Sequence, residues 1–112
     1  MTKGFDKRFS ALANGERGVV AGGRKGIEKE SLRLDMDGYL SQTPHPAELG
    51  SAMSNRYVTT DFSEALLEFV TPAFASTWEA LRFLCDIHQF TYERLDNELL
   101  WIASMPCQIP PD

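Results

Sequence analysis

One stretch of the sequence decides the fold of this chain: Thr59-Thr60-Asp61-Phe62-Ser63-Glu64-Ala65-Leu66-Leu67-Glu68-Phe69-Val70-Thr71-Pro72. It places three carboxylates, Asp61, Glu64 and Glu68, inside one of the most apolar segments. Burying an unpaired carboxylate costs free energy, so such a group usually has a partner, a metal ion or a shifted pKa. The stretch therefore marks a candidate functional region as well as a core element.

The alternation of this stretch favours an extended conformation over residues 57–71. In strand register an acid-bearing mixed face alternates with an apolar face suited to a core. The mixed face holds Glu64, Leu66, Glu68 and Val70, and the apolar face holds Ala65, Leu67 and Phe69. The alternative is a helix, in which Asp61, Glu64 and Glu68 align at i, i+3 and i+7. Thr71-Pro72 ends the element in both cases.

A second acidic stretch lies upstream, at Gly26-Ile27-Glu28-Lys29-Glu30-Ser31-Leu32-Arg33-Leu34. As a strand over 26–34 it points Glu28 and Glu30 out of one face. Two such strands would gather four or five carboxylates, a composition that suits hard divalent cations such as Mg²⁺. The alternative is a solvated sheet face whose acids pair with Lys29 or Arg33, because surface charge is the default for these residue types.

Length and composition indicate one modest domain with its own core, since 43% of the 112 residues are apolar. The net charge of −5, without a basic tract, argues against nucleic acid and anionic membranes as partners. No signal-peptide core and no run of about 18 apolar residues is visible, so we expect a cytoplasmic protein. Cys85 and Cys107 do not form a C-x-x-C pair; we expect a core residue on a helix and a loop thiol, respectively.

The remaining elements follow from periodicity, caps and turn residues. The glycine-rich run 21–26 does not match the spacing of a phosphate loop and is expected to be a flexible approach to the first strand. The expected elements are a helix over 4–13, a turn at 35–38, a return strand beginning at Tyr39-Leu40, a helical turn at 47–50, a helix from a Ser76…Glu79 capping box to about Leu95, and a short strand or helix end at 98–102. Together they predict an α+β domain.

The long helix is expected to turn one apolar stripe towards the core. That stripe is Trp78, Leu81, Leu84, Cys85, His88, Tyr92 and Leu95. We interpret His88 as a satisfied core histidine, and His45, between two prolines, as a surface loop residue. The alternative for both residues is a metal ligand.

Several ordered motifs resemble the N-terminal part of the proteobacterial glutamate–cysteine ligase, over residues 24–109. The motifs are Gly26-Ile27-Glu28-Lys29-Glu30-Ser31-Leu32-Arg33, Gln42-Thr43-Pro44-His45-Pro46, Leu49-Gly50-Ser51-Ala52, Thr59 to Glu68, and Ser104-Met105-Pro106-Cys107. The resemblance implies part of a glutamine-synthetase-like catalytic domain, with an antiparallel sheet curved around the active site and helices outside. It also implies an enzyme of glutathione biosynthesis.

The resemblance further implies a reaction and its site. ATP phosphorylates the γ-carboxylate of L-glutamate, and the amine of L-cysteine attacks the acyl phosphate. Mg²⁺ bridges the phosphates and the glutamate. Its ligands match Glu28, Glu30, Asp61 and Glu68. Phe62 matches a position that lines the pocket for the cysteine side chain, and Glu64 is left as a supporting residue.

Family members are several times longer than 112 residues, so we expect residues 1–112 to be a single incomplete domain. The phosphate-binding arginines and most of the sheet would lie in the missing remainder of the ligase. We therefore expect little or no ligase activity from this chain alone. Two alternatives stay open: a non-catalytic remnant that binds divalent metal or a partner chain, and a related carboxylate–amine ligase with another amine substrate.

Overall fold

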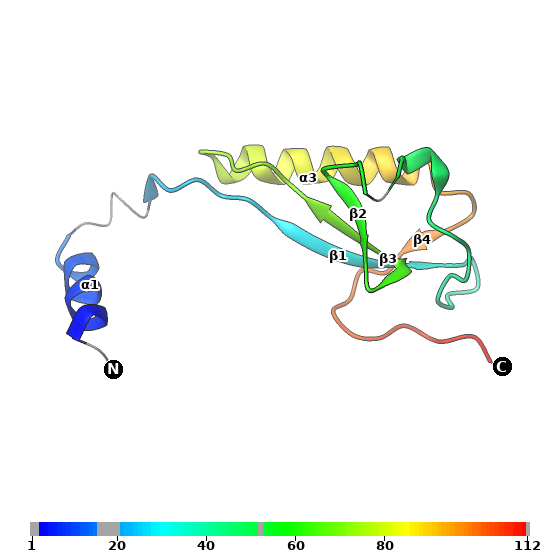
Figure 1. Ribbon diagram of the computed structural model, residues 1–112, viewed down its shortest axis with the longest axis horizontal. Helices are drawn as coiled ribbons and strands as arrows, with labels where there is room; N and C mark the ends of the chain where they lie inside the picture. Colours follow the sequence, from blue (N-terminus) through cyan, green and yellow to red (C-terminus); the bar gives the residue numbers. More distant parts are fainter. Residues whose placement is uncertain (1–2, 16–20, 52, 112) are drawn as a thin grey trace.

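The computed structural model describes residues 3–15, 21–51 and 53–111. Its elements are α1 (Lys3–Ala13), β1 (Glu28–Leu34), η1 (Ala47–Leu49), β2 (Val58–Asp61), β3 (Ser63–Val70), α3 (Thr77–Tyr92) and β4 (Leu99–Leu100). The strands form one antiparallel sheet in the order β2-β3-β1-β4. Figure 1 shows α3 on one side of this sheet and the segment that follows β4 on the other. The α+β class predicted from the sequence is confirmed.

The central pair of the sheet joins the two acidic stretches. β1 and β3 pair in a register that sets Glu30 opposite Glu68 and Ser31 opposite Leu67. The pairing continues past the strands through the Thr71 amide, which donates to the Ile27 carbonyl at 2.9 Å. The side chain of Thr71 accepts from the Ile27 amide at 2.9 Å as well, so this end of the ribbon is tied twice.

The extended region expected over 57–71 is two strands rather than one. Asp61 pairs with Ser63 across a register shift, so the chain reverses direction at Phe62. Phe62 has φ 52° and is fully exposed. The sequence offers no glycine or Asn-Gly pair at this point, which is why the turn was not predicted. The helical alternative for this stretch is wrong.

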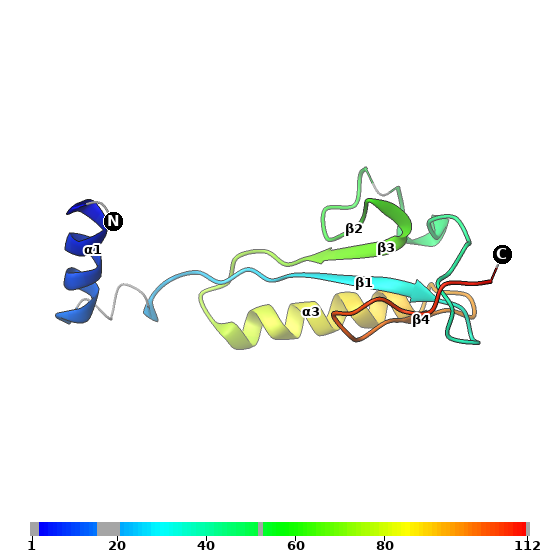
Figure 2. The same ribbon diagram turned by 90° about the horizontal axis from the view of Figure 1, so that it is seen from below.

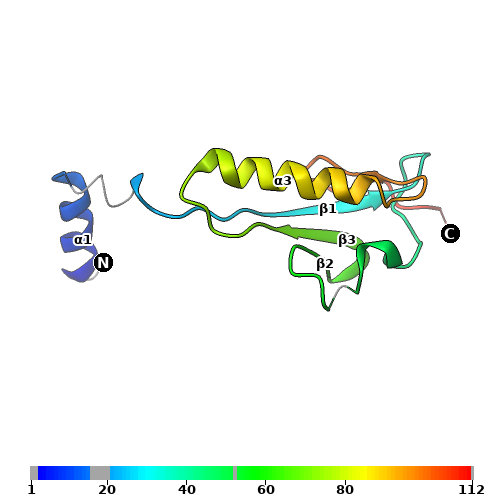
Figure 3. The ribbon, with the colours of Figure 1, turned by 90° about the horizontal axis from the view of Figure 1, so that it is seen from above.

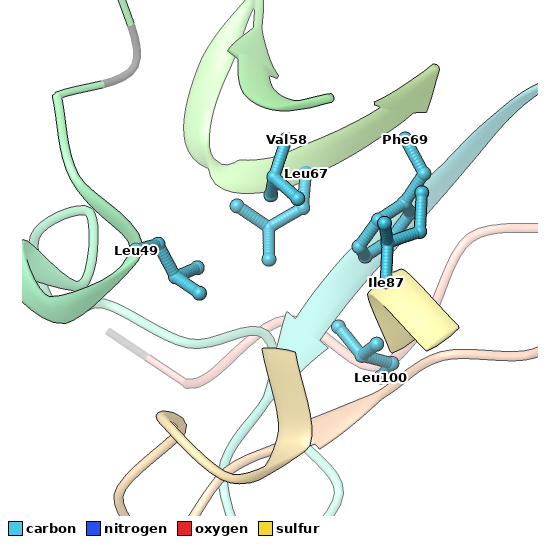
Figure 4. Packing of buried hydrophobic residues seen from close by; sticks show 6 residues of the cluster. All are labelled: Leu49, Val58, Leu67, Phe69, Ile87 and Leu100. Atoms are coloured by element: carbon cyan, nitrogen blue, oxygen red, sulfur yellow. The ribbon is translucent and has the colours of Figure 1, made fainter. Parts of the chain in front are cut away.

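A compact apolar cluster lies between α3 and the sheet, and Figure 4 shows its six buried members. These are Leu49, Val58, Leu67, Phe69, Ile87 and Leu100. Leu67 and Phe69 come from the predicted apolar face of β3 and are completely buried, so that prediction is confirmed. His88 is half-buried, stacks on Phe69 with ring centroids 4.4 Å apart, and meets the Leu84 carbonyl at 2.8 Å through Nδ1, as expected of a satisfied core histidine.

The helix α3 begins where the sequence predicted, with Ser76 as N-cap accepting from the Trp78 amide. It ends three residues before the predicted Leu95. Its buried side is rotated from the predicted stripe, since Ala80 and Thr91 are completely buried and Ile87 is buried. Leu84 and Leu95 of the predicted stripe still pack against the core cluster. Trp78, Leu81, Cys85 and Tyr92 are exposed. The prediction of Cys85 as a core residue is therefore wrong.

The N-terminal helix α1 confirms the element expected over 4–13, yet it carries no buried residue. Figures 2 and 3 show it apart from the sheet. The predicted return strand at Tyr39-Leu40 forms only isolated bridges, to Gln108 and Leu34, after a turn in which Gly38 has φ 88°. The short η1 matches the predicted helical turn. Within the described residues, none of the helices is both long and apolar enough to cross a membrane.

Candidate functional site

The face of the sheet turned away from α3 carries the acidic residues. Glu30 on β1 lies directly opposite Glu68 on β3, and Thr59 on β2 lies opposite Glu68 from the other side. Glu28 is two residues from Glu30 on the same face, because side chains alternate along a strand. Asp61 stands at the end of β2. The structure thus brings Glu28, Glu30 and Glu68 together on the two central strands, and sets Asp61 at the hairpin end.

The segment that follows β4 makes a wall beside these acids. The Trp101 amide donates to the Leu32 carbonyl at 2.8 Å, and the Trp101 indole donates to the Met105 carbonyl at 2.7 Å, which folds the segment into a loop. Between loop and sheet lies an open groove of about 800 Å³. Its lining residues are Glu28, Lys29, Glu30, Ser31, Leu32, Leu66, Glu68 and 101–106. Three of the four predicted metal ligands therefore share this groove, and Asp61 and Phe62 are not among its lining residues.

Negative charge accumulates on this face, and within the described residues no ion pair neutralises it. Burial raises the pKa of Glu68, and the negative charges of Asp61, Glu28 and Glu30 raise it further. Neither Lys29 nor Arg33 forms an ion pair with these four acids within the described residues. Both alternate onto the other face of β1, where the Lys29 ammonium donates to the Ser31 hydroxyl. The pairing with Lys29 or Arg33 that the solvated-face interpretation required is absent there.

The described residues do not by themselves close a metal site. In the ranges 3–15, 21–51 and 53–111, no group of three or more His, Cys, Asp or Glu side chains is placed to hold a metal ion. The acids share a face and influence each other's charge, but the set of ligands is open. Any ion held there would need further donors or a closer approach of the carboxylates.

The sequence did not reveal a buried polar cluster at the far end of the same strands. Arg33 is completely buried and forms an ion pair with Glu98 at 2.7 Å. Burial alone would raise the pKa of Glu98, but hydrogen bonds from Ser41, Thr43 and Arg33 and the charge of Arg33 outweigh it and lower the pKa. A signal was present, because Arg33 lies in register with the core-facing Ser31 rather than with Glu30.

Comparison with known proteins bears on this acidic groove. The family described as "Glutamate-cysteine ligase" matches residues 10–112. The chain belongs to the glutamate–cysteine ligase family. A glutamate–cysteine ligase of Alcanivorax borkumensis is 49% identical over 111 residues, which is 98% of this chain and 21% of that relative. One of Pseudomonas fluorescens is 54% identical over 87 residues, covering 78% of this chain and 16% of the relative.

Solved structures of glutamate–cysteine ligase and glutathione synthetase share the fold. The glutamate–cysteine ligase of Francisella tularensis, determined in complex with AMP, superposes with a TM-score of 0.65 at 37% identity over 67% of this chain and 15% of that one. A bifunctional glutathione synthetase from Pasteurella multocida gives a TM-score of 0.78 at 33% identity over 89% of this chain and 14% of that one. The chain spans about a fifth of the length of the curated ligases it matches.

Proposed function

We propose that this chain supplies the acidic strand pair of the active site of an ATP- and Mg²⁺-dependent glutamate–cysteine ligase. In this reaction the γ-phosphoryl group of ATP passes to the γ-carboxylate of L-glutamate. The amine of L-cysteine then attacks the acyl carbon, and inorganic phosphate leaves as γ-glutamylcysteine forms. One observation carries the proposal: in a chain of this family, Glu30 and Glu68 face each other across the two central strands, in an open groove.

The donors in the groove suit a hard divalent cation. Carboxylate oxygens are the ligands that Mg²⁺ prefers, and a cation would relieve the repulsion that raises the pKa of Glu68. The residues that would hold Mg²⁺ are Glu28, Glu30, Asp61 and Glu68. Because the described residues do not complete a metal site, the remaining ligands would come from the part of the ligase that this chain does not contain.

The residues of the chain have two roles in this proposal. Bound Mg²⁺ would screen the charge of the phosphates, so that one anion can attack another. The carboxylates fix where that positive charge sits, and the exposed Phe62 at the hairpin tip borders the cysteine side chain. The open groove of about 800 Å³ offers space for substrate groups, and the 101–106 loop bounds it on one side.

A chimera tests this proposal directly. The chain replaces the matching N-terminal fifth of the Alcanivorax borkumensis ligase, to which it is 49% identical. We expect the chimera to form γ-glutamylcysteine from glutamate, cysteine and ATP. The double substitution Glu28→Gln with Glu68→Gln should lower this activity by at least about 100-fold and raise the Mg²⁺ concentration needed for half-activation, because ligand losses exceed the roughly 10–100-fold of outer-shell changes.

A matched control removes the same number of charges elsewhere. Glu48 and Asp86 are exposed residues outside the groove, and Glu48→Gln with Asp86→Asn should leave activity within about twofold. A chimera that melts cooperatively but makes no product would overturn the proposal. So would an acidic double variant whose rate and Mg²⁺ dependence match those of the control.

A further inference from the structure

The strand β1 serves two faces with alternate residues. Its exposed side presents Glu28 and Glu30 to the groove, and its core side presents Arg33, which is completely buried. The guanidinium therefore cannot reach a substrate in the groove. Any influence it has on the reaction must pass through the groups that it holds.

Arg33 gathers three segments that are distant in the sequence. Its Nη1 donates to both carboxylate oxygens of Glu98, at 2.8 and 2.7 Å, and to the Thr43 hydroxyl at 2.8 Å. Its Nη2 donates to the carbonyl oxygens of Thr43 at 2.8 Å, Pro44 at 3.2 Å and Glu64 at 2.9 Å. The Nε has no partner among the described residues, so the two terminal nitrogens make all of these bonds.

The bond to the Glu64 carbonyl lies where the sheet would otherwise let go of the hairpin. Paired register between β1 and β3 stops at Leu32 and Leu66, two residues short of Glu64. Beyond it come Ser63 and Phe62, whose side chain is fully exposed and whose φ is positive. Among the described residues, no packing of the Phe62 side chain fixes the tip. The guanidinium, through its bond to the Glu64 carbonyl, anchors this end of β3 to β1.

Glu98 holds the anchor in place. Its carboxylate is 8% exposed and accepts hydrogen bonds from Arg33, the Ser41 hydroxyl and, at 2.5 Å, the Thr43 hydroxyl. A buried guanidinium without its carboxylate is strongly unfavourable, so the pair must be kept or lost as a unit. The same residue stands directly before β4, which leads into the 101–106 wall of the groove.

We infer that Arg33 and Glu98 are positioning residues for the cysteine side of the active site, acting through the Asp61–Phe62 hairpin tip. The inference rests on the proposed function, in which Phe62 borders the cysteine side chain. Loss of the guanidinium fork would shift the tip, which carries Phe62 and one proposed Mg²⁺ ligand, Asp61. It would leave the other three proposed ligands, Glu28, Glu30 and Glu68, in place on the paired parts of β1 and β3. The affinity for cysteine should therefore change more than the affinity for ATP.

Steady-state kinetics of the chimera test the inference. Arg33→Lys keeps the positive charge and loses the fork; we expect the KM for cysteine to rise about 5–20-fold while the KM for ATP changes less than about twofold. Thr43→Val, a milder change that removes one hydroxyl of the cluster, should shift the KM for cysteine in the same direction. The core variant Ile87→Val is the control, because it lowers stability without touching the cluster and should leave both KM values unchanged.

Hydrogen exchange on the 112-residue chain gives a readout that does not depend on ligase activity. In Arg33→Lys or Thr43→Val, amides of residues 59–66 should exchange at least about tenfold faster, relative to those of α3, than in the unchanged chain. Uniform acceleration along the chain, or a KM for cysteine that tracks the Ile87→Val control, would overturn the inference. An inactive chimera with selective loosening of 59–66 would reject the proposed function and leave the anchoring of the tip established.

Discussion

At the scale of single residues, the face of like charges is the costliest feature of this chain. Glu30 and Glu68 are directly opposed, and like charges in that arrangement destabilise an antiparallel pair. The raised pKa of Glu68 means that the folded chain holds its proton to higher pH than the unfolded chain does. Stability is therefore greatest below the ordinary pKa of 4.5 as far as this group is concerned, and it falls as the pH rises through the raised value.

Substitution of Glu68 by glutamine should remove this pH dependence. Since a cross-strand pair is worth about 0.2–1 kcal/mol, we expect Glu68→Gln to raise the melting temperature at pH 7 by roughly 2–4 °C and to leave it nearly unchanged at pH 4. Thermal melts between pH 4 and 8 measure the difference. Effects of Glu98, whose pKa is lowered, are common to both proteins and cancel. Asp86→Asn, on the exposed surface of α3, should show no such trend, and parallel curves for Glu68→Gln and the unchanged chain would contradict the prediction.

At the scale of elements, the β2–β3 hairpin separates side chains that serve the fold from one that does not. Phe69 is completely buried in the core, whereas Phe62 is fully exposed at a positive φ. A non-glycine residue in that region of backbone space carries a cost of about 1–2 kcal/mol. Retaining an aromatic ring there has no benefit for packing within the described residues, which is what a substrate contact would require.

We expect opposite results from two phenylalanine substitutions in this hairpin. Phe62→Gly should leave the free energy of unfolding unchanged or raise it by up to about 1 kcal/mol, because glycine adopts a positive φ without strain. Phe69→Ala should lower it by about 3–5 kcal/mol through the cavity it leaves. Urea unfolding of both variants measures the contrast. A Phe62→Gly chain that is destabilised by more than about 1 kcal/mol would show that the ring has a structural role.

The elements also show what a single sequence can and cannot specify. Alternation in β3 identified Leu67 and Phe69 as core and placed Glu68 on the opposite, acid-bearing face, because a strand has a fixed period of two. The turn at Phe62 escaped prediction because its geometry is imposed by pairing and by the Arg33 anchor rather than by a local turn residue. The rotation of α3 escaped as well, since Ala80 and Thr91 are buried through the close approach of the helix and not through their own hydrophobicity.

The candidate site divides in the same way. The four acids were identified by pattern, and the resemblance to the ligase family assigned them to metal. Their common face follows from the sheet register. The groove wall at 101–106 and the Arg33–Glu98 cluster, by contrast, depend on contacts between residues as far apart in sequence as Leu32 and Trp101. Such long-range contacts have no local signature in the sequence. Only the assembled fold brings them into view.

At the scale of the whole molecule, the chain has a small core and a large exposed apolar surface. Six buried residues form the central cluster, while Ile102 and Ile109 are 88% and 74% exposed. The sheet ends in two short edge strands, β2 with four residues and β4 with two. Such short edge strands discourage pairing with another chain, whereas exposed apolar side chains such as these are typical of a surface that meets further polypeptide.

The isolated chain should therefore bind Mg²⁺ weakly and catalyse nothing. We expect no ATP-dependent γ-glutamylcysteine formation from the purified 112 residues. We also expect a rise in melting temperature that becomes clear only at millimolar Mg²⁺, since tenfold saturation adds about 1.4 kcal/mol to the folded state. Circular dichroism melts across a Mg²⁺ series, with the Glu28→Gln/Glu68→Gln chain as control, provide the measurement. Product formation by the chain alone, or equal shifts in both proteins, would contradict this expectation.

The alternation along β1 has a consequence for how genes of this family can vary. Because neighbouring residues of the strand face opposite sides, deletion or insertion of a single codon within Glu28–Leu34 would turn the residues on one side of the change to the other face. Either the glutamates would enter the hydrophobic layer beneath α3, or the arginine would emerge on the groove. In both cases the alternation that separates the acidic face from the core face would be lost. Natural length variation should therefore concentrate in the connections and spare this strand.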